Sequence, residues 1–552
     1  MHDVIVIGAG HNGLTCGAYL AREGRRVLVL ERRSIVGGMC TTEETVPEAP
    51  GFKMNPCAVD TALTNIPVSV VDELNLARYG LRFVAPDPWA AYVNPDGASI
   101  GMWADRSRTQ AEIARLSRRD AESFASFCDM MTEAWWALMP YFQDHPTRPT
   151  FTTIGQVLWR MAKGRRSLRG AARVFMSSPE QVIEEHFERP EVKAVLANLA
   201  AWSMLPLQED GSGGVLAMMC SYFQWAVKRP IGGSGEFTGA LAACLRDHGG
   251  EIRTDAAVDE VLVHDGRAYG VRLRDGRELR ARHVIGATDP VSLIGLVPDE
   301  HVPDGTRAEL RAMGNLRWNI TCLKADVALS RTPALKCGRP ELMHGYLLLG
   351  PTLDYIKHAQ AESMIGELPE HMAMGPMFPS LVDRSQVPPG SEGETIYLYM
   401  PAVPLELSGG RDWDDVKSGY TDKVIAELDT YLPGLKDSVI GHWCQSPKDL
   451  AKKSTRGNVV HVDMSLSQMG PLRPTPSLSG YRTPVEDLWH TGAGAHPMGA
   501  LQGWSGRTTA RTVDKAMKRT KRVAPATIPP PTARLATSGR GAVAQPLGAR
   551  SE

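Results

Sequence analysis

The stretch "MHDVIVIGAGHNGLTCGAYLAREGRRVLVLE" (residues 1–31) decides the fold, because a strand, a glycine turn, a helix and a second strand follow one another in it. Asp3–Ile7 and Arg26–Leu30 are short apolar runs of the kind found in buried parallel strands. Gly13–Glu23 lies between them and is predicted to be a helix. A strand–helix–strand unit of this size predicts an α/β fold with a parallel sheet.

The turn between the first strand and the helix has the spacing Gly8-x-Gly10-x-x-Gly13. Gly8 permits the tight turn, Gly10 lets the backbone approach a pyrophosphate, and Gly13 lets the helix pack closely on the strand. The start of the helix adds free N–H groups and a partial positive charge. Glu31 ends the second strand, where its carboxylate can accept from a ribose hydroxyl and would repel a 2′-phosphate. The unit predicts a dinucleotide site.

A glycine doublet, Gly37-Gly38, follows in "ERRSIVGGMC" (residues 31–40). In flavoproteins of the glutathione reductase class, which bind two dinucleotides, such a doublet continues the FAD site, so this segment resembles them. We therefore assign Arg32 and the doublet to an FAD site. No C-x-x-x-x-C pair lies near Cys40, so a disulfide reductase is excluded.

Gly232–Pro290 is the next informative segment. It predicts a helix near Phe237–His248, hairpin turns at Asp265-Gly266 and Asp275-Gly276, and the strands Glu251–Arg253, Ala257–His264, Ala268–Leu273 and Glu278–Ile285. A plain antiparallel meander is the local alternative. The position of this segment after the opening strand–helix–strand unit favours an FAD fold instead. In FAD folds of this class the backbone of a residue placed like Val258 lines the adenine, and a segment like "VIGATDP" returns to the parallel sheet.

A second glycine-rich turn appears late, in "DLWHTGAGAHPMGALQGWSGRTTARTVDKAMKR" (residues 487–519). We expect a strand over Leu488–Thr491, a turn over Gly492–Gly499, and a helix that begins there and runs through Lys518. Its positive end would point at the isoalloxazine, and Gly494 and Gly499 are assigned to the cofactor. No further G-x-G-x-x-G follows a strand, so no NAD(P) domain is predicted.

The motif "GAGAHPMGALQG" (residues 492–503) resembles the C-terminal flavin motif of bacterial-type phytoene desaturases. "TEETVPEAPGFK" (42–53) and "GNVVHVDMSLSQMGPLRP" (457–474) are similar to relatives of pyridine nucleotide-disulfide oxidoreductase domain-containing protein 2. From residue 2 to about 520 the chain thus resembles the FAD-dependent amine oxidase–phytoene desaturase superfamily. The resemblance implies a glutathione-reductase-type, Rossmann-like FAD domain (1–85, 231–320 and 456–520) interleaved with an α+β substrate domain (86–230 and 321–455).

The resemblance also implies an activity: hydride transfer from a carbon of a largely apolar small molecule to flavin N5, with oxygen or a quinone as the electron acceptor. Two other functions stay open: a redox-neutral, flavin-dependent isomerase of an apolar unsaturated substrate, and a non-catalytic lipid- or prenyl-binding escort-type module. The FAD is expected to be non-covalent, since no cysteine follows Cys444. Catalytic candidates by motif position are His496, His461 and Gln468, each with a structural role as the alternative.

Met498 and Trp504 are candidate substrate-pocket residues, because they stand where the related groups carry small residues. "GVLAMMCSYFQWAVKR" (214–229) is rich in Met and aromatic residues, and is either core or substrate channel.

Composition excludes several classes of function. With 61 Lys and Arg against 62 Asp and Glu, no global field favours nucleic acid. The nine cysteines have no C-x-x-C or zinc spacing, so we expect no metal site, and buried thiols in a reducing, cytoplasmic compartment. No apolar stretch is long enough to span a bilayer.

Two further segments stand apart in composition. Gly155–Met176 combines basic and apolar residues without an acid. It either contacts the inner face of an anionic membrane or is a solvated basic face, and Gly164 and Gly170 weaken it as a single helix. The Pro-, Ala- and Gly-rich tail 521–552 is predicted to be disordered.

Overall fold

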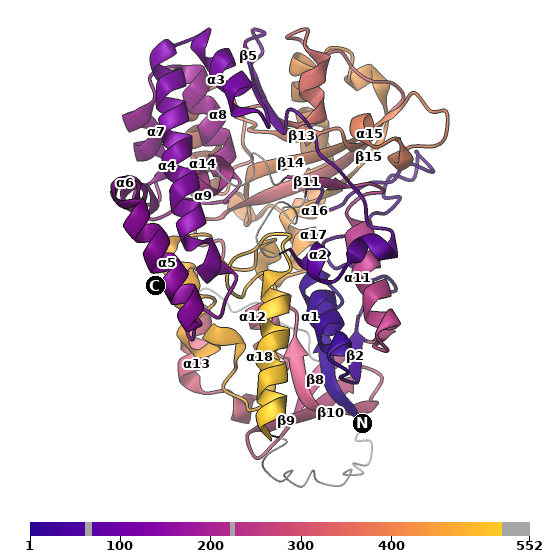
Figure 1. Cartoon of the computed structure of the whole chain (residues 1–552). Coiled ribbons are helices and arrows are strands. Elements are labelled where there is room, and N and C mark those ends of the chain that lie inside the picture. The colour runs from indigo at the N-terminus through magenta and orange to yellow at the C-terminus, as the bar shows by residue number, and fades with distance from the viewer. Residues whose placement is uncertain (61–68, 221–226, 521–552) are drawn as a thin grey trace.

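A computed structural model describes residues 1–60, 69–220 and 227–520 of the 552-residue chain (Figure 1). The predicted disorder of the tail 521–552 lies outside the described residues, as do residues 221–226 of the Met-rich stretch. The remainder of that stretch begins with helix α9 (Gly214–Met218), whose last four residues are buried.

The lower part of the molecule in Figure 1 is built on a parallel sheet in the order β7-β2-β1-β10-β16. Its strands are β7 (Glu251–Arg253), β2 (Val27–Leu30), β1 (His2–Ile7), β10 (Glu278–Gly286) and β16 (Leu488–His490). The apolar runs of β1 and β2 are fully buried, as expected of parallel strands covered on both faces. Strands from three distant regions of the sequence therefore meet in one sheet.

The predicted meander is confirmed as an antiparallel extension of this sheet. Strands β8 (Val258–His264) and β9 (Arg267–Leu273) pair with each other, and β9 pairs with the first half of β10. Gly266 and Gly276 in the connecting turns have φ values of +73° and +87°, which glycine adopts without strain. The second half of β10 pairs with β1 in parallel, so "VIGATDP" does return to the parallel sheet.

Three helices cover this sheet: α1 (His11–Arg22), α11 (Gly235–Asp247) and α18 (Trp504–Thr520). Helix α18 crosses α1 so closely that a Cβ at Gly506 would lie 2.3 Å from the backbone O of Asn12. The expectation that α18 begins at the end of the late glycine turn is wrong. It begins at Trp504, because Gly503 has a φ of +71°, which interrupts a right-handed helix.

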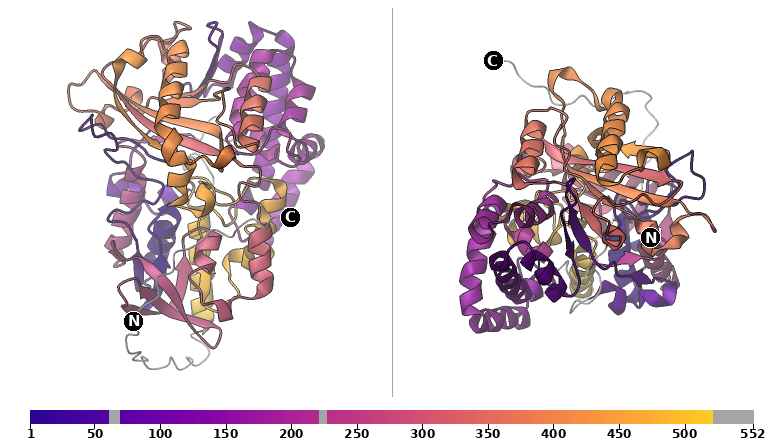
Figure 2. Two further views of the ribbon diagram at one scale, coloured as in Figure 1. Left: turned by 180° about the vertical axis from the view of Figure 1, so that it is seen from behind. Right: turned by 90° about the horizontal axis from the view of Figure 1, so that it is seen from above.

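The upper part of the molecule contains an antiparallel sheet in the order β13-β14-β11-β15 (Figures 1 and 2). Its strands are β13 (Gly375–Met377), β14 (Glu394–Pro404), β11 (Ile320–Leu329) and β15 (Val439–Gln445). Strands β4 (Ala90–Val93) and β5 (Ser99–Met102) form a hairpin around Asp96-Gly97, and β12 (Tyr346–Leu348) joins β4 in parallel. Short strands β3 (Phe83–Val84) and β6 (Arg229–Pro230) form a fourth sheet.

A group of helices lies beside these upper sheets (Figure 1). It comprises α3 (Arg106–Ala114), α4 (Arg118–Phe142), α5 (Phe151–Lys163), α6 (Arg165–Met176), α7 (Pro179–His186), α8 (Pro190–Ala201), α9 and α14 (Leu353–Met364). The other α-helices of the described residues are α16 (Trp413–Tyr431) and the shorter α2 (Val70–Glu73), α12 (Pro290–Ile294), α13 (Asp304–Ala312), α15 (Pro379–Val382) and α17 (Pro447–Ala451). Gly164 separates α5 from α6, so the basic segment is not one continuous helix.

The mixed helix and sheet architecture is that of an α/β protein. The division into an FAD domain and a substrate domain at the predicted boundaries stays a prediction. In the part of the chain that the structure describes, no helix combines the length and the apolar character that crossing a bilayer requires.

Candidate functional site

One cavity of about 610 Å³ brings together segments that are far apart in the sequence. The opening glycine turn, the glycine doublet, the start of β8, residues 287–289, the segment 459–461 and the late glycine turn all contribute to its wall. Seven of the predicted cofactor-binding residues line it: Gly8, Gly10, Glu31, Arg32, Gly38, Val258 and Gly499. Gly13, Gly37 and Gly494 lie behind the wall and shape it.

The three glycines of the opening turn have different surroundings. A Cβ at Gly13 would lie 2.1 Å from the backbone O of Gly8, so α1 sits directly on the turn. Gly8 has a φ of +101°, and a Cβ there would lie 3.1 Å from the backbone O of Ala287. A Cβ at Gly10 would meet no atom within 4 Å. Since Gly10 lines the cavity, this open side is where a ligand can approach the backbone.

The glycine doublet packs against the same turn. The backbone N–H of Gly37 donates to the backbone O of Ala9 at 2.9 Å. A Cβ at Gly38 would lie 3.1 Å from the Cα of Gly10, and both doublet residues have positive φ values. The doublet therefore continues the wall that the opening turn begins.

Glu31 is buried at the end of β2, with its side chain on this wall. Its Oε2 accepts from the N–H of Ala9 at 2.9 Å, and its Oε1 accepts from the N–H of Arg33 at 3.0 Å. These bonds orient the carboxylate and leave each oxygen able to accept once more. Gly10, the N-cap of α1, supplies no side-chain cap, so the first N–H groups of the helix are left for a ligand.

The late glycine turn is held against two other parts of the chain. A Cβ at Gly494 would lie 2.8 Å from Cδ of Pro290 and 3.4 Å from Cβ of His461. A Cβ at Gly499 would lie 2.7 Å from Cβ of Val460. Both glycines therefore allow the turn to pack on the segment that carries His461.

Arg473 is the residue that ties these pieces together. Its guanidinium is buried and donates to five backbone oxygens, at 2.7 to 3.3 Å: those of Val460, Val462, Asp463, Gln468 and Ala493. Burial lowers the pKa of Arg473 to about 10, so it stays charged near neutral pH. The sequence contained a signal, since Arg473 lies inside the matched motif 457–474, but nothing in the local pattern indicated its role.

His461 lines the cavity, and its Nδ1 is buried without a hydrogen-bond partner in the described part of the chain. It has a φ of +66°, a strained conformation for a residue other than glycine. Burial lowers the pKa of His461 to about 4, so the ring is neutral near pH 7. A neutral imidazole with a free ring nitrogen can donate or accept one hydrogen bond to a ligand in this cavity.

Asp289, which sequence reasoning did not select, also lines the cavity. Burial alone would raise the pKa of Asp289, but His461 and hydrogen bonds from Ser292 and Thr455 outweigh burial and lower it. His11 is a second missed lining residue, although it stands within the opening motif. Its Nδ1 lies 3.5 Å from Sγ of Cys40, and burial raises the pKa of that thiol, which stays protonated.

The other two catalytic candidates lie outside the lining of this cavity. His496 is buried, with its Nε2 3.2 Å from the backbone O of Tyr141 and its ring 5.2 Å from the Tyr141 ring. The Gln468 side chain donates to the backbone O of Ser467 at 3.1 Å. His496 Nδ1 and Gln468 Oε1 are also buried without a hydrogen-bond partner among the described residues, and the catalytic roles of both residues stay predictions.

The first residues of helix α18 do not line the cavity. The Ser505 Oγ instead accepts from the N–H of Gly492 at 3.1 Å, and the N–H of Gly506 donates to Oδ1 of Asn12 at 3.3 Å. The start of the helix therefore braces the two glycine turns, and the hypothesis that its positive end points at the cofactor stays a prediction.

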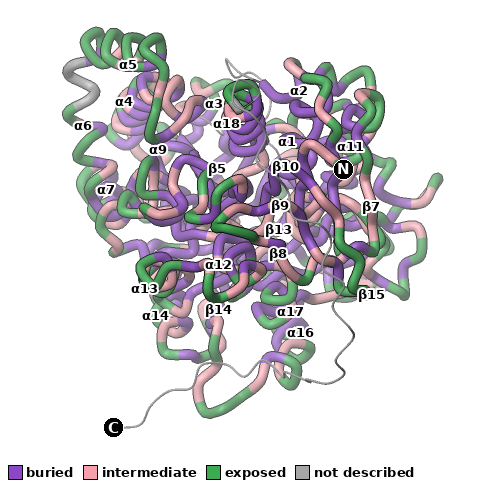
Figure 3. Tube along the Cα trace, turned by 90° about the horizontal axis from the view of Figure 1, so that it is seen from below, coloured by how far each residue is buried: buried purple, intermediate pink, exposed green. Residues whose placement is uncertain are grey.

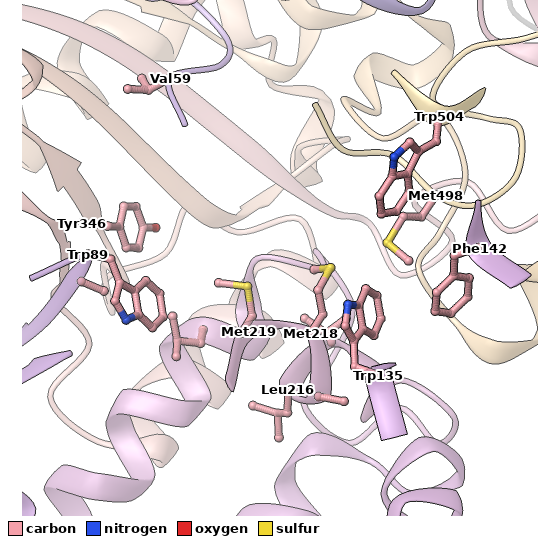
Figure 4. Close-up of a cluster of buried hydrophobic side chains, with 14 of the residues drawn as sticks. Val59, Trp89, Trp135, Phe142, Leu216, Met218, Met219, Tyr346, Met498 and Trp504 are labelled. Atoms are coloured by element: carbon pink, nitrogen blue, oxygen red, sulfur yellow. The ribbon is translucent and has the colours of Figure 1, made fainter. Parts of the chain in front are cut away.

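Met498 and Trp504 belong to a buried apolar cluster that Figure 4 shows. Trp135 and Phe142 from α4 and Met218 from α9 face them across this cluster. Met498 is 5% exposed and Trp504 is 1% exposed. The cluster thus joins the late glycine turn to the helices of the upper part.

The donor set fits FAD. The open side of Gly10, the uncapped N–H groups of α1, the buried carboxylate of Glu31 and the unpartnered ring nitrogen of His461 belong to the wall of one cavity. Arg32, Arg33, Arg274 and Lys453 line the same cavity and add the positive charge that a pyrophosphate requires.

Comparisons with known proteins agree with this arrangement. Residues 13–354 match the family model described as flavin containing amine oxidoreductase. The chain is 32% identical to mouse pyridine nucleotide-disulfide oxidoreductase domain-containing protein 2, over 94% of each chain. It is 28% identical to one of the limonene dehydrogenase proteins of Castellaniella defragrans, over 93% of this chain and 95% of that one.

A solved oxidoreductase from Methanosarcina mazei shares the fold, with a TM-score of 0.58 at 17% identity over 93% of this chain and 99% of that one. The family match covers more than half of the chain. The chain belongs to the flavin containing amine oxidoreductase family and is a flavin-dependent oxidoreductase. The predicted superfamily is confirmed.

Proposed function

We propose that the chain binds one FAD non-covalently in the 610 Å³ cavity and that both glycine turns contact it. The observation that carries the proposal is that Gly8 and Gly10, early in the chain, and Gly499, late in it, line the same cavity. The parallel sheet with its antiparallel extension supports the finer assignment of a glutathione-reductase-type FAD domain with an interleaved substrate domain.

Bound FAD would supply a hydride acceptor at N5 for a substrate carbon. The proposed substrate is a largely apolar small molecule, which the name of the limonene dehydrogenase relative supports. The buried apolar cluster of Met498, Trp504, Trp135 and Phe142 beside the late glycine turn is compatible with it, since this cluster contains no charged side chain.

The chain's own residues have distinct tasks in this proposal. Glu31 and the start of α1 hold the dinucleotide end. His461 presents a neutral ring nitrogen, which orients a polar group or accepts a proton at Nδ1. Arg473 acts through the backbone by keeping the His461 segment and the late turn in register.

The electron acceptor is proposed to be oxygen or a quinone, since no second dinucleotide motif follows a strand in the sequence. We place the protein in the cytoplasm, peripheral to the inner face of a membrane. Nine cysteines, all free, support a reducing compartment.

The test begins with the visible spectrum of the purified protein after incubation with FAD. The proposal predicts a flavin spectrum and its anaerobic bleaching by an apolar substrate. Product formation without net reduction of an acceptor would instead identify the redox-neutral isomerase. A colourless protein that cannot be loaded with FAD would identify the escort-type binding module and overturn the proposal.

A further inference from the structure

Helix α5 (Phe151–Lys163) turns apolar side chains towards solvent, whereas a surface helix usually turns them towards the core. Phe151 is 94% exposed, Trp159 is 64% exposed and Leu158 is 60% exposed, and Ile154 and Met161 are also exposed. These residues recur at the spacing that places them on one side of a helix. Exposed apolar residues contiguous on one face mark an interaction site.

The opposite side of α5, which faces the protein, is polar or small apart from the half-buried Val157. Thr153 is its one buried residue, and the Thr153 hydroxyl donates to Oδ2 of Asp144 at 2.6 Å. The Arg160 guanidinium donates to the backbone O of Trp136 on α4. At the end of the helix, a Cβ at Gly164 would lie 2.5 Å from Oε1 of Glu133. The apolar side therefore points outward because polar contacts hold the other side against α4, and Figure 3 shows α5 as a largely exposed element at the edge of the molecule.

The surroundings of α5 are strongly basic. Residues 145–179 contain seven Lys and Arg and no Asp or Glu. Lys163 and Arg169 are exposed, and the ammonium of Lys163 lies 5.4 Å from the ring of Trp159. A cation beside an exposed tryptophan suits a membrane interface, where the ring lies at the level of the headgroups.

The basic surface continues past the start of α5. Residues 143–150, which lead into α5, share a cavity of about 520 Å³ with α18. Six basic residues line this cavity against the acids Asp144, Glu486 and Asp487: Arg148, Arg482, Arg507, Arg511, Lys515 and Arg519. Glu486 and Asp487 are paired with Arg267, and Arg507 and Arg511 are paired with Glu73; both partners lie outside this lining. Arg148, Arg482, Lys515 and Arg519 are the remaining cations of the lining.

We propose that α5 is an interfacial membrane anchor. Its face of Phe151, Ile154, Leu158, Trp159 and Met161 enters the boundary between headgroups and acyl chains of an anionic bilayer, and the surrounding cations bind the headgroups. Charge complementarity selects this occupant. A second copy of the chain would bring two basic surfaces together, which opposes self-association.

The anchor has a structural connection to the ring end of the cofactor site. Helix α5 rests on α4, whose last residues, Tyr141 and Phe142, pack against His496. The anchor would therefore hold the late glycine turn close to the bilayer that dissolves an apolar substrate. This consequence rests on the proposed function, whereas membrane binding itself does not.

The experiment is co-sedimentation of the full chain with vesicles of phosphatidylcholine, with and without phosphatidylglycerol, at low and high salt. We expect binding to the anionic vesicles that falls as salt rises. The double variant Phe151→Asp/Leu158→Asp should lose at least about tenfold in partitioning, because it removes the two apolar residues at the centre of the face. The matched control is Ile365→Asp, which changes another exposed apolar residue, 70% exposed, just after α14.

Other results would overturn the anchor. These are no binding of the wild-type chain to anionic vesicles at low salt, equal binding of the double variant, or a dimer that the double variant abolishes without any vesicle binding. Thermal unfolding shows whether the variants are folded. FAD content and flavin reduction by a detergent-solubilised substrate are measured in parallel, so failure of the proposed function and failure of the anchor give different results.

Discussion

Replacing Gly10 by alanine separates binding of the cofactor from folding of the chain. A Cβ at Gly10 would meet no protein atom within 4 Å, and the residue has the extended conformation φ −70°, ψ 169°, which alanine also adopts. Alanine at the N-cap of a helix costs about 0.5 kcal/mol relative to glycine. We therefore expect Gly10→Ala to fold with nearly wild-type stability.

The cost to FAD binding should be larger. The new methyl group would project into the cavity at the uncapped start of α1, where the pyrophosphate is proposed to sit. Losing two charge-assisted hydrogen bonds between backbone N–H groups and phosphate costs about 3 kcal/mol, which is roughly a 150-fold increase in Kd. Titration of FAD-depleted protein, followed by flavin fluorescence, measures this change, and denaturant unfolding measures stability.

Two matched alanine variants complete the experiment. Gly13→Ala places its Cβ 2.1 Å from the Gly8 backbone O, so it should destabilise the fold itself by about 3 kcal/mol or more. Gly239→Ala lies on the exposed side of α11 with nothing within 4 Å, and should change neither property adversely. If Gly10→Ala binds FAD as tightly as Gly239→Ala does, the cavity is not the pyrophosphate site.

Three further predictions follow from buried polar groups. Arg473→Met removes the donor to five backbone oxygens and should lower the free energy of unfolding by about 3 kcal/mol or more, with release of flavin; unchanged stability in urea would refute the clamp. Glu31→Gln keeps an acceptor for the Ala9 N–H but turns an NH2 group towards the Arg33 N–H. We therefore expect the free energy of unfolding to fall by about 1 kcal/mol and FAD binding, measured by titration, to weaken roughly tenfold, whereas equal affinity would contradict the assignment. The third prediction concerns pH, because burial lowers the pKa of four histidines from 6.5 to about 4: His11, His461, His490 and His496. The stability that they contribute is complete above pH 6.5 and is lost as pH falls towards 4, at roughly 5 kcal/mol per pH unit for all four together. Urea titrations at pH 7, 6 and 5 measure this loss, and a flat profile would show that the rings are solvated.

Local pattern predicted the elements of the FAD region well, because each depends on nearby residues. Alternation of apolar runs with glycine turns located β1, α1 and β2, and the Asp-Gly pairs located both hairpin turns of the meander. The start of α18 was misplaced because the prediction included Gly503 in the helix, whereas its positive φ, a property of the folded chain, keeps it outside.

Long-range pairings could not be predicted from local signals. Tyr346 pairs with Ala90 in the upper part of the molecule, and nothing near either residue indicates the partner. Arg473 and Asp289 were missed for the same reason, since their roles appear only when distant backbone segments surround them. Composition indicated that residues 155–176 combine basic and apolar side chains, but it could not show which side of α5 packs on α4.

Hydrogen–deuterium exchange of the FAD-depleted and FAD-loaded protein tests most directly whether one cofactor spans both turns. We predict that FAD slows amide exchange in residues 8–14 and also in residues 492–501, with little change in α5. Protection of the early turn alone, or of neither turn, would contradict the claim that both ends of the chain bind a single FAD.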